Sequence, residues 1–302
     1  MKNLFITTPV IESPVLSAIS NANVYLKLEM LQPTGSFKIR GISRLCNHYI
    51  KQGATSFVSS SGGNAGLSVA YVGNKLGIPV TVVVPKTTNQ MVKEYILSEK
   101  ATVITHGSHW EEANIIAKKI SQSENAFYIH PFDNPLLWEG YSTIIQEAKS
   151  QIKPPGAIIL SVGGGGFLCG VYEGLKKVGW TDIPIIATET HGTHSFNLSL
   201  NRSNSNRLKS IKSIASSLGS PYVCEQLLKI SKKANIISYV VTDQEAVTAC
   251  SRFARDHHFL VEPACGAALS IVYNQILKGQ QYSSLLILVC GGNNLQIFEG
   301  CF

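Results

Sequence analysis

The sequence lacks the features that mark membrane, secreted and disordered proteins. No stretch approaches the ~18 consecutive apolar residues that a membrane span needs, and the opening residues MKNLFITTPVIESP contain no apolar segment of signal-peptide length. Charged residues make up only 15% of the 302 residues, whereas 44% are hydrophobic, a balance typical of a globular protein. We therefore expect no membrane partner and a cytoplasmic location.

The chain also lacks paired cysteines at a metal-binding spacing. Its seven cysteines are odd in number and include no CxxC pair. This argues against a disulfide framework and against a structural zinc site. We expect reduced thiols.

Acidic residues are scarce in one stretch of the chain, where much of the net charge of +7 is concentrated. Seven basic residues lie between Arg202 and Lys233, against the single acidic residue Glu225. No aromatic interleaving and no nucleic-acid-binding motif accompany them, so we interpret the stretch as a solvated face and expect no nucleic-acid partner. The polar segment NRSNSNRLKS at 201–210 is typical of a surface loop.

What the chain does contain is an alternation of apolar, β-branched runs with amphipathic stretches. The predicted strands are TSFVSS, PVTVVVP, ATVITH, AFYIH, AIILSV, IPIIATE, IISYVVT and SLLILVCGG. This rhythm predicts βαβ units and parallel sheets. The strands form two groups, from about 55 to 130 and from 157 onward, bridged by PFDNPLLWEG, so we expect two α/β domains. Ligands of such folds bind where the carboxyl ends of strands open into loops.

Lys38 occupies an unusual position in LQPTGSFKIRG. A turn at 33–35 is followed by Ser36, which we predict as the N-cap of a helix, so Lys38 falls in the first helical turn. The positive end of the helix dipole disfavours a cation there. A neutral lysine amine avoids that cost and is a nucleophile, but the residues alone leave open whether Lys38 is reactive or a solvated charge.

Two glycine-rich segments follow predicted strands. SSSGGNAG at 59–66 precedes a helical pattern, so its backbone N–H groups could meet an anion, with Asn64 as a further donor; the alternative is a tight connection without a ligand. GGGGFLCG at 163–170 also suits an anion, yet neither a dinucleotide fingerprint nor a Walker-type loop fits its spacing.

Two further segments carry weaker signals. In LVCGGNNL at 288–295, Cys290 lies at a strand's carboxyl end, where it is either a buried structural thiol or part of a site. In VEPACGAALS at 261–270, Glu262 precedes a proline turn and a small-residue helix start.

In order along nearly the whole chain, SFKIRG, SSGGNAG, SVGGGGFLCG, ETHGTHSF, VEPACGAA and VCGGNN resemble the motifs of fold-type II pyridoxal-phosphate enzymes. The resemblance is to the serine and threonine dehydratases, and especially to the short, liver-type serine dehydratases. It implies the tryptophan synthase beta-like architecture of two parallel-sheet α/β domains. Residues 1–34 and 138–302 would form the large catalytic domain, and 35–137 a small domain carrying the lysine and the SSGGNAG loop.

The resemblance also implies roles for individual residues. Lys38 would form the Schiff base with pyridoxal 5'-phosphate, Phe37 would pack against its ring, and Asn64 would bind its 3'-oxygen. The phosphate would be held by backbone N–H groups of the four glycines Gly163, Gly164, Gly165 and Gly166. The substrate carboxylate would be cradled by Ser61, Gly62 and neighbouring amides, with Asn64 and Ser217 also at the substrate.

By the same resemblance Cys290 faces the pyridine nitrogen. A neutral thiol does not force protonation of the ring, so the ring is a shallower electron sink and β-elimination is favoured. The implied activity is that of a lyase: L-serine dehydratase, releasing pyruvate and ammonia in L-serine catabolism, with some activity on L-threonine. Alternatives are a threonine dehydratase, a β-replacement enzyme of the same fold, or a catalytically silent relative.

Finally, the family resemblance implies a homodimer and a monovalent cation, potassium. The matching cation positions are Glu189, Thr193, Leu218 and Ser220. Two departures from the family pattern are Gly62, where some members have Ala, and Asn293, where Ser is common in the liver type.

Overall fold

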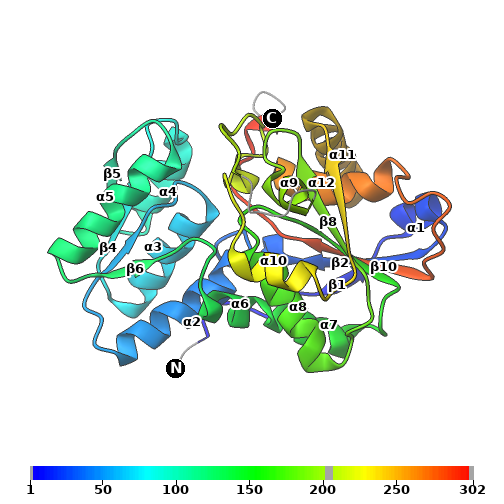
Figure 1. The fold of residues 1–302 in the computed structure, drawn as a ribbon, viewed down its shortest axis with the longest axis horizontal. Coiled ribbons are helices and arrows are strands. Elements are labelled where there is room, and N and C mark those ends of the chain that lie inside the picture. The colour runs from blue at the N-terminus through cyan, green and yellow to red at the C-terminus, as the bar shows by residue number, and fades with distance from the viewer. Residues whose placement is uncertain (1–2, 201–206, 299–302) are drawn as a thin grey trace. The chain divides into compact units, whose positions relative to one another are not determined.

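The structure, a computed structural model, describes residues 3–200 and 207–298. The chain divides into two compact units, one comprising Met1–Ile6 and Gln32–Gly140 and the other Thr7–Leu31 and Tyr141–Phe302. Both are α/β units (Figure 1). The roles assigned to the domains 1–34 with 138–302 and 35–137 stay predictions. Of the predicted surface loop at 201–210, residues 201–206 lie outside the described residues, and 207–210 are irregular and mostly exposed.

The first unit is built on a four-stranded parallel sheet in the order β5-β4-β3-β6. Figure 1 labels β4, β5 and β6. Its strands are β3 (Phe57–Ser59), β4 (Val80–Val84), β5 (Thr102–Thr105) and β6 (Phe127–Ile129). Its helices are α2 (Lys38–Lys51), α3 (Asn64–Leu76), α4 (Gln90–Ser98), α5 (Trp110–Ser123) and α6 (Pro135–Tyr141), the last ending at the boundary between the units.

Both faces of this sheet are buried. Val58 and Val83 pack with Ala113 and Ala117 of α5 on one face. Successive side chains of a strand point to opposite faces, and on the opposite face the glycines of α3 approach Val80 and Val82 closely. Strands covered on both faces read as continuous apolar runs, which is why the sequence pattern predicted them.

The second unit contains a six-stranded sheet in the order β1-β2-β10-β7-β8-β9. Its strands are β1 (Val10–Glu12), β2 (Asn23–Leu28), β7 (Ala157–Ser161), β8 (Ile185–Thr190), β9 (Ile236–Val241) and β10 (Ser284–Val289). Its helices are α1 (Pro14–Ser20), α7 (Thr143–Gln151), α8 (Gly166–Val178), α9 (Ser195–Leu200), α10 (Glu225–Ser231), α11 (Asp243–His257) and α12 (Pro263–Tyr273). Short 3₁₀ helices are η1 (Glu29–Leu31), η2 (Ser216–Leu218) and η3 (Gln296–Phe298).

All eight predicted strands are confirmed, and the sequence analysis missed two more. Strand β2 lies beside β10, and β1 pairs antiparallel with β2 at the sheet edge. The sequence analysis did not predict β2 because its segment NVYLKL contains polar and charged residues. Its Lys27 is completely buried, and the cost of burying the amine is offset because it donates to the Thr8 carbonyl and to Glu147, both at 2.7 Å.

Each sheet has one point at which the winding of the chain reverses. In the first unit, the chain runs from β3 outward to β4 and β5 and returns to the other side of β3 as β6. In the second, it runs from β7 outward to β8 and β9 and returns to the other side of β7 as β10. Ligands of open α/β sheets bind beyond the carboxyl ends of strands at such switch points. The residues that follow β3, β6, β7 and β10 are therefore the candidates for function.

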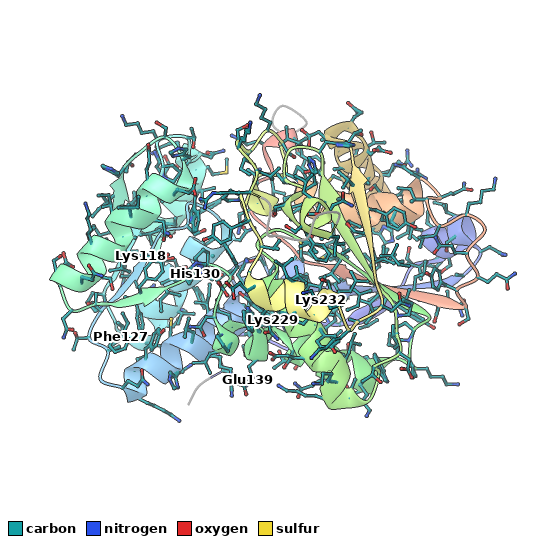
Figure 2. The ribbon with its side chains drawn as sticks, viewed as in Figure 1. Lys118, Phe127, His130, Glu139, Lys229 and Lys232 are labelled. Atoms are coloured by element: carbon teal, nitrogen blue, oxygen red, sulfur yellow. The ribbon has the colours of Figure 1, made fainter. Side chains whose placement is uncertain are left out.

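Two predictions from composition can be compared with the described residues. Within 3–200 and 207–298 no helix combines the length and apolar character needed to cross a membrane. In the basic stretch, Arg207, Lys209, Lys212, Lys229, Lys232 and Lys233 all have exposed side chains. Figure 2 labels two of them, Lys229 on α10 and Lys232 directly after it.

Candidate functional site

Lys38 is the first residue of α2, as the sequence predicted, but the predicted N-cap is wrong. Phe37 occupies the cap position in a helical conformation and supplies no side-chain cap. Ser36 therefore stands one residue before the cap. Its hydroxyl is buried and has no hydrogen-bond partner within the described part of the chain. A buried polar atom of this kind is usually satisfied by a water or a ligand.

The amine of Lys38 is held close to two neighbours in its own unit. Its Nζ donates to the Pro131 carbonyl oxygen at 3.3 Å and lies 4.7 Å from the centre of the Phe37 ring. The side chain is half-buried at the uncapped start of α2. Partial burial and the positive helix end disfavour the ammonium form, whereas the Pro131 carbonyl and the Phe37 ring favour it, so opposing contacts act on the protonation of this amine.

The loop after β3 opens onto the first turn of α3. Gly63 is the N-cap residue, Asn64 is the first helical residue, and no side chain caps the helix. Ser61 Oγ accepts from Gly63 N at 3.4 Å. An added Cβ on Gly66 would overlap the Ser61 carbonyl oxygen, so the loop folds tightly onto its own helix. Uncapped N–H groups at a helix start bind carboxylates and phosphates well.

Hydrogen bonds between partly buried side chains hold the residue before this loop in place. Ser60, directly before Ser61, lies 2.8 Å from the Tyr128 hydroxyl of β6 and donates to Asn114 Oδ1 of α5 at 3.1 Å. Tyr128 also donates to Asn114. Ser59 donates to the Ile129 carbonyl at 3.2 Å. These bonds tie the end of β3 to the end of β6.

His130, which the sequence analysis missed, is the first residue after β6. Its Nδ1 accepts from the backbone N–H groups of Phe132 at 3.2 Å and Asp133 at 2.9 Å. Its ring meets Tyr128, Phe132 and Trp110 edge-on. Burial, and then the positive charges of Lys118 and Lys38, lower the pKa of His130 to about 4. Only the strand order, which places β6 beside β3, could have drawn attention to it.

In the second unit, the four glycines join β7 to α8. Gly165 is the N-cap residue with φ +91°, a left-handed conformation that favours glycine, and no side chain caps α8. An added Cβ on Gly163 would come within 3.2 Å of the Leu218 backbone, and Gly164 accepts from Cys224 N at 3.0 Å. The arrangement presents the start of a 13-residue helix to an anion.

Cys290 follows β10 and is 4% exposed. Its sulfur lies 3.7 Å from the Ser161 hydroxyl at the end of β7 and 3.3 Å from the sulfur of Cys265 on α12. Burial raises the pKa of the Cys265 thiol well above its usual range. Cys290 thus joins the end of β7, which leads into the glycine loop, to the start of α12.

The carboxylate of Glu262 connects two loops of the second unit. It accepts from Ser217 Oγ at 2.5 Å and from Asn294 N at 3.1 Å. Gly292, at φ +151°, leaves the space that the carboxylate fills. Ser217 is exposed on η2, beside Leu218, whose backbone approaches Gly163. The weak signal at Glu262 thus marks a residue that fixes the predicted substrate residue Ser217.

The predicted cation residues lie at the end of β8 and just after it (Glu189, Thr193), and in η2 and just after it (Leu218, Ser220), and all four are buried. Both carboxylate oxygens of Glu189 accept backbone N–H groups, from Phe196 and Asn197, each at 2.8 Å. Burial nevertheless raises the pKa of Glu189 to about 8. Thr193 is bonded to Thr190, and Ser220 donates to the Tyr222 carbonyl at 2.5 Å. A nearby cation would favour the ionised form of the Glu189 carboxylate.

Each unit therefore gathers part of the predicted site at its own switch point. Lys38, Phe37, Ser61, Gly62 and Asn64 belong to the first unit. The four glycines, Ser217 and Cys290 belong to the second.

Known proteins similar to this chain match it along nearly its whole length. A family model described as pyridoxal-phosphate dependent enzyme matches residues 2–291. The human L-serine dehydratase/L-threonine deaminase is 45% identical over 98% of this chain and 93% of its own length. A fungal L-serine ammonia-lyase from Rhizomucor miehei superposes with a TM-score of 0.94 at 34% identity, covering both chains completely. A maize serine racemase reaches a TM-score of 0.90 at 25% identity, over 96% of this chain and 89% of its own.

Proposed function

Because the chain belongs to the pyridoxal-phosphate dependent enzyme family, we propose that it is an L-serine dehydratase that converts L-serine to pyruvate and ammonia and also acts on L-threonine. The observation that carries this proposal is the 45% identity, over 98% of the chain, to a protein named L-serine dehydratase/L-threonine deaminase. Several of the residues expected for such an enzyme also lie after the switch-point strands: the Ser61 loop follows β3, the four glycines follow β7, and Cys290 follows β10.

The residues present fit pyridoxal phosphate in their chemistry. In the second unit, the uncapped start of α8 and its glycine turn suit a phosphate group, which Gly163–Gly166 would hold through backbone N–H groups. In the first unit, Lys38 would bond to the cofactor and Asn64 would bind its 3'-oxygen. The buried, unpartnered Ser36 hydroxyl, two residues before Lys38, is a further donor for a bound group.

When bound, pyridoxal phosphate withdraws electrons from the Cα atom of an amino acid attached to it. Lys38 would then act at Nζ as the base that takes the Cα proton, for which its amine must be neutral. Its place at a positive helix end and its partial burial favour that form. Loss of the serine hydroxyl from Cβ completes the elimination, and the overall change converts serine to pyruvate plus ammonia.

The substrate carboxylate needs fixed donors so that the Cα proton is presented to Lys38. Ser61, Gly62 and the first N–H groups of α3 would supply them, supported by Ser60, Tyr128 and Asn114 beneath. Ser217, fixed by Glu262, would contribute from the second unit.

Cys290 would face the pyridine nitrogen as a neutral thiol. Its neighbours Ser161 and Cys265 are uncharged, and Cys265 is held in its thiol form by burial. A neutral partner leaves the ring a weaker electron sink, which favours prompt loss of the hydroxyl over reprotonation at Cα. This supports elimination over racemisation.

Three further properties are part of the proposal. Potassium would bind beside Glu189, Thr193, Leu218 and Ser220, as the family resemblance implies, and its charge would favour the ionised form of the Glu189 carboxyl group, whose pKa burial raises to about 8. The six described cysteines are free, which suits a reducing, cytoplasmic location. The homodimer rests on the family resemblance and is tested by the molar mass in solution.

The test is Lys38→Ala, with Lys51→Ala as its matched control. Lys38→Ala removes the base, so we expect keto-acid release from serine to fall by at least about a thousandfold while the fold is retained. Lys51 lies in the last turn of the same helix with an exposed side chain, and its variant should keep wild-type activity. Keto-acid release from serine, threonine and O-acetylserine, with serine racemisation followed in parallel, identifies the reaction.

Near wild-type activity in Lys38→Ala would refute the assignment of the base. Wild-type protein that binds the cofactor but releases no keto acid from any of these amino acids would refute the proposed activity.

A further inference from the structure

We infer that His130 is a positioning residue that holds the Lys38 amine in place through the Pro131 carbonyl, an inference that builds on the role proposed for Lys38. His130 follows β6 and Lys38 begins α2, so the two are far apart in the chain. The strand order brings the end of β6 to the switch point of the first unit, beside the loop that carries Ser61.

The imidazole fixes a turn of the main chain. Its Nδ1 accepts two backbone N–H groups, those of Phe132 and Asp133, at 3.2 and 2.9 Å. A nitrogen that accepts cannot carry a proton, so the ring is neutral, with its proton on Nε2. The other side of the turn is closed by Trp138 Nε1, which donates to the Phe132 carbonyl at 2.9 Å.

Pro131 lies inside this turn, and its carbonyl oxygen receives the Lys38 amine at 3.3 Å. Proline fixes its own φ, and Pro131 and Phe132 are buried. The direction of the Pro131 carbonyl is therefore determined by the turn that His130 closes. Lys38 Nζ lies at the end of a flexible side chain, so a hydrogen-bond acceptor in a fixed position restricts the amine to one place.

Aromatic neighbours hold the imidazole itself. Phe132, Tyr128 and Trp110 meet the ring edge-on, with the Phe132 ring centre 4.6 Å away. The charged groups that act on His130 are Lys118 of α5 and Lys38 of α2, both positive. Figure 2 labels Lys118 and His130 within this unit. Two cations near the ring oppose its protonation and keep Nδ1 an acceptor.

The inference predicts a pH effect with a definite sign. The pKa of His130 is about 4 in the folded chain and about 6.5 when unfolded. Between these values the unfolded chain binds more protons, so stability falls as the pH is lowered from about 6.5 toward 4. His130→Asn, which cannot titrate, should lose less stability over this range than the wild type does, as measured by urea unfolding at each pH.

The direct test measures the Lys38 amine in the full chain after the cofactor is removed. Acetic anhydride labelling from pH 6 to 10, read by peptide mass spectrometry, gives the apparent pKa and reactivity of Lys38. Lys51, exposed in the last turn of the same helix, is the internal reference.

His130→Ala removes the acceptor and frees the Pro131 carbonyl, so Lys38 loses a hydrogen bond that favours its ammonium form. We expect the labelling of Lys38 at pH 7 to rise by about tenfold or more, because the lost hydrogen bond is one to a charged group, with Lys51 unchanged. His130→Asn offers an oxygen to the same two N–H groups and should restore the wild-type profile. His130→Asp introduces a negative charge that stabilises the ammonium form, so it should raise the apparent pKa of Lys38.

Asn89→Ala is the matched control for general destabilisation. Asn89 makes the same kind of side-chain bond, to Met91 N at 2.8 Å, at the start of α4 in the same unit. Its loss should lower stability by about 1 kcal/mol without changing Lys38 labelling. The readout needs no turnover, so it stands even if Lys38→Ala shows that another residue is the base.

An unchanged Lys38 profile in folded His130→Ala and His130→Asp would overturn the inference. So would a folded His130→Asn that behaves like His130→Ala. If His130→Ala does not fold, the comparison of His130→Asn with His130→Asp still decides, because only a residue coupled to Lys38 gives different profiles for them.

Discussion

The switch points of the two sheets use the same local design with different chemistry. In each, a strand ends in a small-residue turn that opens onto an uncapped helix, α3 after β3 and α8 after β7. In each sheet, the strand on the other side of the switch point is followed by one side chain of interest: His130 comes after β6 and Cys290 after β10. A single topological rule therefore locates four candidate segments.

The difference lies in what surrounds each end residue. His130 has two cations acting on it and keeps an unprotonated acceptor that orders the main chain. Cys290 has a hydroxyl and a second thiol beside it and brings no charge. In the proposed function, the first unit would provide a base and the carbonyl that holds it, while the second would provide donors for an anion and a partner for a ring.

Glycines near both switch points are also constrained by the packing of the protein itself. The sequence analysis connected the run at 163–166 with the approach of a ligand. In the structure, Gly163 is pressed against the Leu218 backbone and Gly165 adopts a left-handed conformation. Gly66 of the first unit is closed against the Ser61 carbonyl. Some of these glycines are required by the protein's own packing before any ligand arrives.

The largest effect is expected from Gly66→Ala. The new methyl group would overlap the Ser61 carbonyl oxygen, which belongs to the main chain and cannot move aside cheaply. We expect a loss of about 3 kcal/mol or more in the free energy of unfolding, measured by urea denaturation. Gly63→Ala is the matched control, because an added Cβ there meets nothing within 4 Å and its φ of −141° is open to any residue. Equal stability of the two variants would show that the loop is not closed by this contact.

A smaller effect, on the course of the reaction, is expected from Cys290→Asp. A carboxylate facing the pyridine nitrogen would stabilise the protonated form of the ring, which is a stronger electron sink. Keto-acid release from serine should fall by about tenfold, or more than 1 kcal/mol in the barrier, and racemisation should increase relative to it. Cys290→Ser keeps a neutral partner and should still eliminate.

The control for Cys290→Asp is Cys265→Ser, which changes the neighbouring thiol alone. A folded, cofactor-loaded Cys290→Asp with the wild-type rate and product ratio would remove Cys290 from the site. If the Asp variant unfolds because of its buried charge, Cys290→Asn and Cys290→Ser still compare two neutral partners, and both should eliminate.

The smallest effect is expected from Gly165→Ala. A left-handed conformation costs a residue with a Cβ about 1 to 2 kcal/mol, and the methyl group would also lie 2.7 Å from Leu227 Cδ2. Gly179→Ala has the same left-handed strain with nothing within 4 Å, so it isolates the backbone cost. We expect Gly165→Ala to be the less stable of the two and to retain less cofactor after dialysis. Full retention would place the phosphate elsewhere.

Much of the molecule was predictable because its signals are local. Eight strands were visible as apolar, β-branched runs, and those buried on both faces, such as β7 and β8, have no polar alternation. The signals for Lys38 at a helix start and for the glycine turns after β3 and β7 were also carried by neighbouring residues in the sequence. Strand β2 was missed because the partners of its buried Lys27 include Glu147, which is distant in the chain. The N-cap was misplaced at Ser36 because its residue type is favourable there, whereas the observed helix begins after Phe37.

The local patterns of the sequence were enough to predict the α/β class and the order of the motifs, and to propose which residues would hold a phosphate and supply an amine. The neighbours of each strand became known only from the folded chain, which shows that His130 lies by the loop of Ser61 and Cys290 by the glycine turn. The two pairings that create the switch points join segments 70 residues apart in β3 and β6 and 128 residues apart in β7 and β10. No local pattern encodes these pairings, so the coupling of His130 to Lys38 becomes visible only when the sheet is formed.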